Sequence, residues 1–165
     1  MNKIRSSMNR RQLPSGVHEF DDLFVGDWFE TGQLTVSAKL IETFADLTGD
    51  HFEIHMDDAA ARALGFPCRV AHGLLVLSLI DGLKNQAQAR FRAVASLGWT
   101  WRFDGPVFIG DKISAKITIA GKRSTKRSDR GIVSLDFLVT NQDDATVQSG
   151  QNQLMVVRTQ SSDTL

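Results

Sequence analysis

The stretch HGLLVLSLIDGLKNQAQAR, residues 72–90, decides how the rest of the chain folds. Its first half is apolar on nearly every face of a helix, and its second half is polar. A helix with this pattern starts in the protein interior and emerges into solvent. The apolar run is shorter than the ~20 residues of a membrane span, and Asp81 interrupts it. We therefore expect a helix whose beginning, at Gly73, is buried in a core built by the rest of the chain.

Two shorter helices are expected before this stretch. Ser37 is a good N-cap residue, and Gly49 suits the end of the helix that Ser37 begins. An apolar stripe at helical spacing lies between them and consists of Leu40, Ile41, Phe44 and Leu47. Asp57 can cap a second, short helix, DAAARAL, which the Gly-Phe-Pro of residues 65–67 would end.

The second half of the chain has the period-two pattern of strands. SLGWTWRF, residues 96–103, alternates and would place on one side Leu97, Trp99, Trp101 and Phe103. DKISAKITIAG, GIVSLDFLVTN and ATVQSGQNQLMVVR are further predicted strands, and FDDLFVGDWFETGQLTVS contains an opening one. One strand, then helices, then antiparallel strands give an α+β class. The natural packing wraps this antiparallel sheet around the long central helix, which is the hotdog fold. We expect a single such domain over residues 17–160, with a flexible N-terminal arm over 1–16 and a C-terminal tail over 161–165.

Composition narrows the function classes. The 165 residues are 42% hydrophobic, which is enough for one folded core. The formal net charge of zero argues against nucleic-acid binding, which usually needs a basic balance. Cys68 is the only cysteine, so a reducing, cytoplasmic compartment fits best. The first residues lack the apolar core of a secretory signal, and no membrane association is expected.

Asp50 and His55 form the first candidate site, on a connection between helices that we expect to be irregular. A carboxylate and an imidazole can divide proton transfers between them. The alternative is structural: Asp50 caps the chain after Gly49, and His55 is a hydrogen-bonded core histidine. Gly73 adds unpaired N–H groups and a positive dipole at a helix start, where an oxyanion would be stabilised.

The segment FADLTGDHFEIHMDDAAARALGFPCRVAHGLLVLSLIDGL, residues 44–83, resembles the hydratase signature of MaoC-like, (R)-specific enoyl-CoA hydratases and dehydratases. FDDLFVGDWFETGQLTVS and SLGWTWRFDGPVFIGDKI resemble flanking strands of that family. The resemblance implies that Asp50 and His55 add water at C3 of a trans-2-enoyl thioester and manage the proton at C2. It also implies that the N–H of Gly73 polarises the thioester carbonyl. The family commonly has Asp-x-Asn-Pro-x-His, whereas Phe52 and Glu53 replace the asparagine and proline here.

Further expectations follow from the resemblance. It implies an acyl-CoA substrate, as in fatty acid metabolism, a homodimer or higher homo-oligomer, and no cofactor or metal beyond the coenzyme A of the substrate. His51, His55 and His72 with Asp50 could be imagined as a metal site, but their spacing does not guarantee converging ligands. Three residues are weaker substrate-binding candidates: His72, Ser78 and Asp81. Asp81 stands where some relatives carry a cavity serine; alternatively it meets solvent and pairs with Lys84.

Three functions remain open at this point. A hotdog thioesterase would direct water at the carbonyl carbon rather than at C3, and a third possibility is a non-catalytic acyl-binding module. The basic loop of residues 122–130 either holds coenzyme A phosphates or is a solvated hairpin loop. Acyl-chain length, pathway and working direction are not readable from the sequence.

Overall fold

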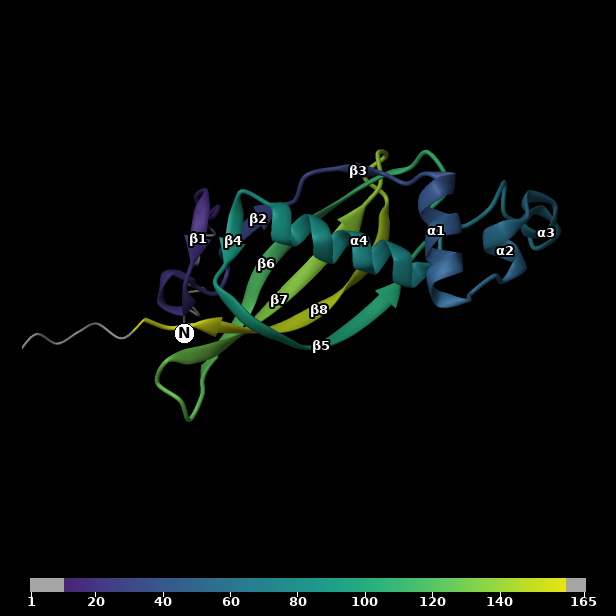
Figure 1. Ribbon diagram of the computed structural model, residues 1–165. Helices are drawn as coiled ribbons and strands as arrows, with labels where there is room; N and C mark the ends of the chain where they lie inside the picture. The colour runs from purple at the N-terminus through teal and green to yellow at the C-terminus, as the bar shows by residue number, and fades with distance from the viewer. Residues whose placement is uncertain (1–10, 160–165) are drawn as a thin grey trace, which may run out of the picture.

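The computed structural model describes residues 11–159. A long helix, α4, lies across one face of a sheet, and the small helices α1, α2 and α3 gather at one end (Figure 1). In chain order the elements are β1 (Gly16–His18), η1 (Phe20–Asp22), β2 (Trp28–Glu30), β3 (Leu34–Thr35), α1 (Ala38–Thr48), α2 (Glu53–Met56), α3 (Asp58–Ala63), α4 (Gly73–Gln86), β4 (Ala89–Phe91), β5 (Ala93–Phe103), β6 (Lys112–Ser124), β7 (Arg130–Thr140) and β8 (Thr146–Val157).

The sheet is antiparallel, with the strand order β2-β6-β7-β8-β5, and β3 also pairs with β6. A separate parallel pair joins β1 to β4. The sheet curves around α4 (Figure 1), so the α+β prediction of a hotdog fold is confirmed. Strand β5 lies at the edge of the sheet, where, among residues 11–159, β8 is its one paired strand.

The packing of α4 creates the core. Its buried apolar side chains, which contact the inner face of the sheet, are Leu75, Val76, Ile80 and Leu83. Two details differ from the sequence prediction. Leu74, in the first turn, is exposed, whereas Lys84, in the polar half, is buried. The helix also ends at Gln86, and residues 89–91 form β4 instead of a further helical turn.

Local signals placed the smaller helices correctly. The Ser37 hydroxyl accepts a hydrogen bond from the Leu40 N–H, and Asp57 accepts one from the Ala60 N–H, so both caps are confirmed. Gly49 ends α1 with a φ of 79°, a left-handed conformation that glycine adopts without strain. The prediction of a buried apolar stripe on α1 is wrong at Leu47, whose side chain is 81% exposed.

Strand β5 departs from simple alternation. The register against β8 shifts between Ser96 and Gly98, which inserts one extra residue opposite the partner strand. Trp99 and Trp101 pack against the core, but Leu97 and Phe103 are exposed. The prediction of four large side chains on one face is therefore wrong for Leu97, whereas Phe103 stays in register with the two tryptophans and its ring lies against Gly73.

The N-terminal segment is attached to the domain from residue 11 onward. The N–H of Leu13 donates to the carbonyl of Trp28, the Leu13 side chain is buried, and β1 pairs with β4. Residues 11–16, assigned above to the arm, thus lie against the sheet. Residues 1–10 of the arm and the tail 161–165 lie outside the described residues. Among residues 11–159, no helix is long and apolar enough to cross a membrane.

Gly150 of β8 offers a test of the sheet register. A Cβ at Gly150 would collide with the main-chain carbonyl of Thr100 on β5 and with the ring of Trp101. We expect Gly150→Ala to lower the free energy of unfolding by about 2 kcal/mol, because backbone in a ladder cannot move aside cheaply. The measurement is urea unfolding. The matched control is Gly98→Ala on β5, where nothing lies within 4 Å. Equal stabilities of the two variants would contradict the register.

Candidate active site

His55 lies on the one-turn helix α2, not on the irregular connection that was expected. Its ring nitrogen Nδ1 is 2.6 Å from the carbonyl oxygen of Val70. Since a carbonyl only accepts, Nδ1 carries the proton and donates it. The other ring nitrogen, Nε2, is left for proton transfer, and this bond fixes the direction of the ring.

Asp50 lies in the loop between α1 and α2, where it is exposed to solvent. Its Oδ1 accepts a hydrogen bond from the N–H of Phe52 at 3.3 Å, and its own N–H donates to Thr48 Oγ1 at 3.2 Å. These short-range bonds form the turn that the left-handed Gly49 begins. The carboxylate is therefore held by its own loop.

His72 brings Asp50 and His55 into contact with the core. Its Nε2 donates to the carbonyl oxygen of Asp50 at 2.9 Å, and its ring stacks on the ring of His55 with centroids 3.9 Å apart. His72 is only 2% exposed. Burial lowers the pKa of His72, against the opposing effect of the bond to Asp50.

The site groups lie close together. Asp50, His55 and His72 each offer an oxygen or nitrogen atom, and these atoms lie within 4.8 Å of one another. Two groups at that separation can both hydrogen-bond one water molecule between them. The stacked rings of His55 and His72 are inclined by only 28°, so their in-plane lone pairs lie in two nearly parallel planes. Ligands of one metal ion at about 2.1 Å must converge, and the arrangement suits proton transfer better.

Gly73 begins α4 directly after His72, as the sequence predicted. Its N–H belongs to the first turn, where main-chain donors have no partner within the helix. Its carbonyl accepts a hydrogen bond from Nε2 of the buried Gln148 at 2.9 Å, and Oε1 of Gln148 accepts from Trp101 at 2.8 Å. The Phe103 ring leaves no room for a side chain, since a Cβ on Gly73 would lie 2.7 Å from it.

A cavity of about 340 Å³ opens beside these groups. His55 and Gly73 both line it, together with apolar side chains from α2–α4 and from the segment after β5. The apolar lining residues are Ile54, Phe66, Val70, Val76, Phe103 and Val107. The imidazole of His55 and the N-terminus of α4 thus face one apolar space, which is the kind of cavity that accepts an apolar ligand.

The model of a protein family described as "MaoC like domain" matches residues 25–141, which is most of the chain. The chain belongs to the MaoC-like domain family. It is 38% identical over 112 residues to "Protein MaoC" of Klebsiella aerogenes, covering 67% of this chain but only 32% of that protein. It is 31% identical over 114 residues to the "(R)-specific enoyl-CoA hydratase" of Aeromonas caviae, covering 69% and 81% of the two chains.

Among solved structures, the MaoC-like dehydratase of Rhodospirillum rubrum superimposes with a TM-score of 0.80 at 26% identity. The overlap covers 87% of this chain and 99% of that one. The match extends over nearly the whole hotdog architecture, so the family assignment rests on sequence and fold alike.

Two of the weaker candidates of this MaoC-like domain lie away from the cavity. Asp81 binds Lys84 through a 2.6 Å contact between Oδ1 and Nζ, and Ser78 donates to the Leu74 carbonyl within α4. Neither residue lines the cavity beside His55. The pairing of Asp81 with Lys84 is the alternative that the sequence left open, although Lys84 is buried and not in solvent.

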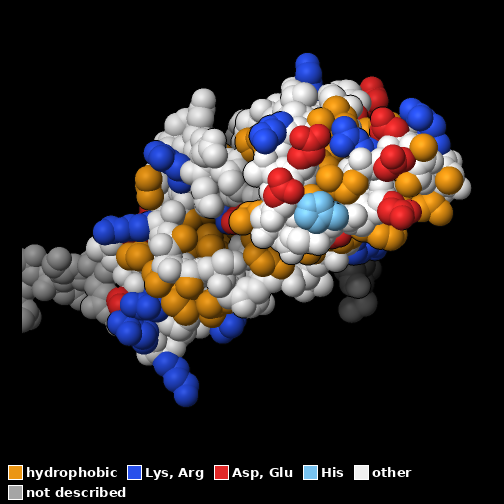
Figure 2. Space-filling model, turned by 45° about the vertical axis from the view of Figure 1, so that its right-hand side comes forward, with side chains coloured by type: hydrophobic (Ala, Val, Ile, Leu, Met, Phe, Trp, Pro, Cys, Tyr) orange, Lys and Arg blue, Asp and Glu red, His pale blue; other side chains and the backbone are white. Residues whose placement is uncertain are grey.

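His51, which follows Asp50, points to a different partner. Its Nε2 lies 3.1 Å from Oδ1 of Asp46 on α1, and this hydrogen bond raises the pKa of His51. Charged side chains of both signs cover the end of the molecule that carries α1–α3, with a histidine and apolar side chains among them (Figure 2). His51 is thus part of a solvated surface.

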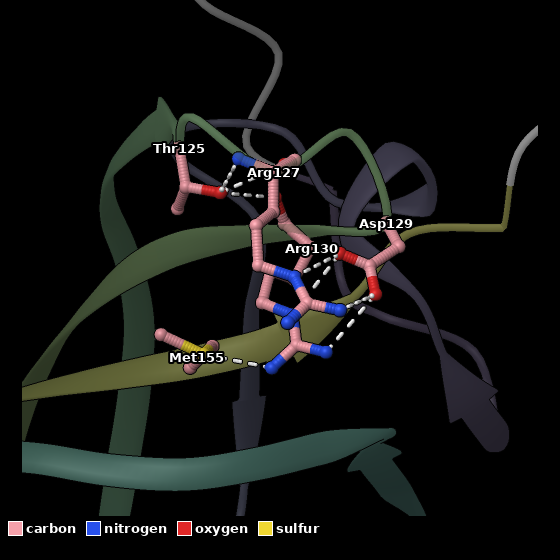
Figure 3. Close-up of polar contacts among 5 residues, drawn as sticks. All are labelled: Thr125, Arg127, Asp129, Arg130 and Met155. Carbon is pink, nitrogen blue, oxygen red and sulfur yellow. Dashed lines mark hydrogen bonds and ion pairs between the residues drawn. The ribbon is translucent and has the colours of Figure 1, made fainter.

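The basic loop lies at the opposite end of the molecule from α1 and α2 (Figure 1). Figure 3 shows Arg127 and Arg130 both binding the carboxylate of Asp129, which keeps the pKa of Asp129 far below its ordinary value. Lys122 donates to the Leu23 carbonyl, and its ammonium lies 4.3 Å from the Phe20 ring centroid. Three of the loop's cations are therefore engaged within the chain, and within one chain the loop does not reach the cavity.

Two parts of the site could not be predicted from the sequence. Gln148 occurs in a segment predicted only as a strand, where simple alternation with the apolar Val147 would place the amide on the outer face. A register shift between β7 and β8 leaves Val147 as an extra residue, and both side chains are buried. Residues 103–107 form the far wall of the cavity, because the chain leaving β5 returns beside α4. Their position depends on the sheet topology, which carries no local signal.

The Asp81–Lys84 pair yields a stability prediction. Removing Asp81 leaves the Lys84 ammonium buried without its partner, so Asp81→Ser should cost about 1–2 kcal/mol in urea unfolding. This is less than for a fully buried pair because the Asp81 side chain is 40% exposed. Adding Lys84→Met should restore most of the loss. If Asp81→Ser instead leaves stability unchanged and shifts preference toward long acyl chains, Asp81 belongs to the acyl pocket.

Proposed function

We propose that this protein catalyses the reversible hydration of an enoyl-CoA, or a related unsaturated acyl thioester, to a 3-hydroxyacyl thioester. One observation carries the proposal: Asp50 lies with a carboxylate oxygen within 4.8 Å of a ring nitrogen of His55, and His55 and Gly73 line a single apolar cavity. The names of the relatives, an (R)-specific enoyl-CoA hydratase and a 3-hydroxybutyryl-CoA dehydratase among them, support the same reaction class.

The reaction follows from the positions of these groups. A water between Asp50 and His55 loses a proton to the pair as its oxygen bonds to C3 of the substrate. Charge then develops on the thioester oxygen, where the N–H of Gly73 and the dipole of α4 stabilise it. The pair returns a proton to C2, so one molecule of water is added across the double bond and dehydration is the exact reverse. No metal ion or separate cofactor takes part in these steps.

A direct assay separates this proposal from the two alternatives. Crotonyl-CoA should lose the absorbance of its conjugated double bond in the presence of the protein, and saturated acyl-CoAs should release no free thiol. Thiol release without loss of the double bond would instead identify a thioesterase. Binding without either reaction would identify a non-catalytic acyl-binding module.

The pair can be tested by substitution. Asp50→Asn and His55→Ala should each lower the hydration rate at least ~100-fold, the scale of general acid–base groups. Both variants should fold, because neither side chain belongs to the core cluster of the described residues. Steady-state rates with crotonyl-CoA and circular dichroism are the measurements. The matched control is His51→Ala, the neighbouring exposed histidine, which should keep most of the activity. Wild-type rates in both site variants would refute the assignment.

We propose further that two copies pair through β5. This edge strand has eleven residues and carries exposed apolar side chains, including Val94 and Leu97. An edge of that length leaves a row of main-chain donors and acceptors without partners in its own sheet. A second copy can satisfy them and cover the apolar side chains in the same step.

The assembly proposal predicts a mass above that of the 18.3 kDa chain in light scattering at micromolar concentration. Leu97→Lys should shift the protein toward the monomer, because a charge replaces apolar surface at the centre of the strand. Val17→Lys is the control, since Val17 is also exposed but lies on β1. A wild-type protein that is only monomeric would contradict the pairing.

A further inference from the structure

We infer that His72 is the positioning residue of the acid–base pair: its Nε2–H holds the main chain of Asp50 while its ring supports the ring of His55. This inference rests on the proposed function of the pair and goes beyond it. His72 neither binds the substrate nor exchanges a proton with it. It fixes the distance between the two groups that do.

The hydrogen bond defines the chemical state of His72. The carbonyl oxygen of Asp50 can only accept, so Nε2 carries the proton and Nδ1 bears a lone pair. Nδ1 is buried and has no hydrogen-bond partner among the described residues. Such a nitrogen costs free energy that an apolar side chain of similar size would not. The hydrogen bond from Nε2 to the main chain of Asp50 gives a reason to keep a histidine at this position despite that cost.

The surroundings keep His72 neutral. Its ring is stacked on His55 and lies 5.0 Å from the Phe44 ring centroid, and the charged or titratable groups that influence it are Asp50, His55 and His51. Desolvation and the neighbouring histidines lower the pKa of His72, and Asp50 opposes them. When His55 takes a proton, the stacked ring therefore stays neutral and keeps donating to Asp50.

His72 also precedes Gly73 in the chain. Its main-chain conformation, with φ −57° and ψ 132°, sets the direction in which α4 begins. One residue thus contacts Asp50 and His55 and is bonded to the proposed carbonyl-binding N–H. A shift of this residue displaces all three groups together, and displacements near 1 Å can cost about 100-fold in rate.

A pair of substitutions separates positioning from packing. His72→Gln places an amide N–H where Nε2 stands, whereas His72→Leu fills the space with no donor. We expect His72→Leu to lower kcat by about 30-fold with little change in KM, and His72→Gln to stay within about 3-fold of wild type. Phe44→Leu, which changes the packing around the same ring, is the control and should lower stability but not kcat. A leucine variant as active as the glutamine variant would overturn the inference.

Nitrogen NMR of the unsubstituted protein tests the same inference without substrate. The chain has four histidines, and the spectrum of His72→Gln identifies the signal of His72. We expect a neutral ring at pH 7 with its proton on Nε2. A neutral ring with its proton on Nδ1, or a ring that is already charged at pH 7, would overturn the inference. Because this experiment measures no turnover, its result can be interpreted even if the protein does not catalyse the proposed reaction.

Discussion

Two hydrogen bonds hold the start of helix α4, one from the sheet and one to the loop after α1, and the geometry of the candidate site depends on them. Gln148 of β8 binds the carbonyl of Gly73, and the His72 ring binds the carbonyl of Asp50. The first bond joins the helix to the sheet, and the second joins the helix to the loop after α1. The start of α4 is therefore a fixed point of the structure, at which the core, the loop that carries Asp50 and the cavity meet.

This fixed point explains why the chemistry concentrates there. The start of a helix carries positive potential and N–H groups that have no partner within the helix. In a buried site these N–H groups need a hydrogen-bond acceptor, which can be a ligand. The cavity places an apolar space beside those N–H groups, and α2 brings His55 to its wall. Asp50 is held mainly by its own turn, so it remains accessible to water. The carboxylate of Asp50, the imidazole of His55 and the N–H of Gly73, to which we assign roles in the proposed reaction, thus come from three separate segments of the chain.

Features governed by local chemistry could be predicted from the sequence. The caps at Ser37 and Asp57, the turn at Gly49 and the start of α4 at Gly73 depend on neighbouring residues, and all four are correct. The resemblance to the family added the roles of Asp50 and His55. Leu97 was misplaced because a one-residue register shift in β5 moves a side chain to the other face.

Contacts between distant elements could not be predicted in this way. Lys84 lies in the polar half of α4, and its polarity predicted a side chain in solvent. In the structure its ammonium lies over the face of the Trp99 ring, and Asp81 supplies a counter-charge. The stacking of His72 on His55 joins the residue that precedes α4 to a residue of α2, and Gln148 comes from the last strand. In each case the tertiary fold decides the environment, and single-residue polarity does not.

In the proposed reaction, water held by Asp50 and His55 attacks C3 of an unsaturated acyl thioester. Mass spectrometry of the product formed from crotonyl-CoA in water labelled with deuterium and oxygen-18 tests this attack. We expect one oxygen-18 in the hydroxyl at C3, one deuterium at C2 and an intact thioester. Oxygen-18 in a free carboxylate, with no deuterium on carbon, would show attack at the carbonyl and contradict the proposed reaction.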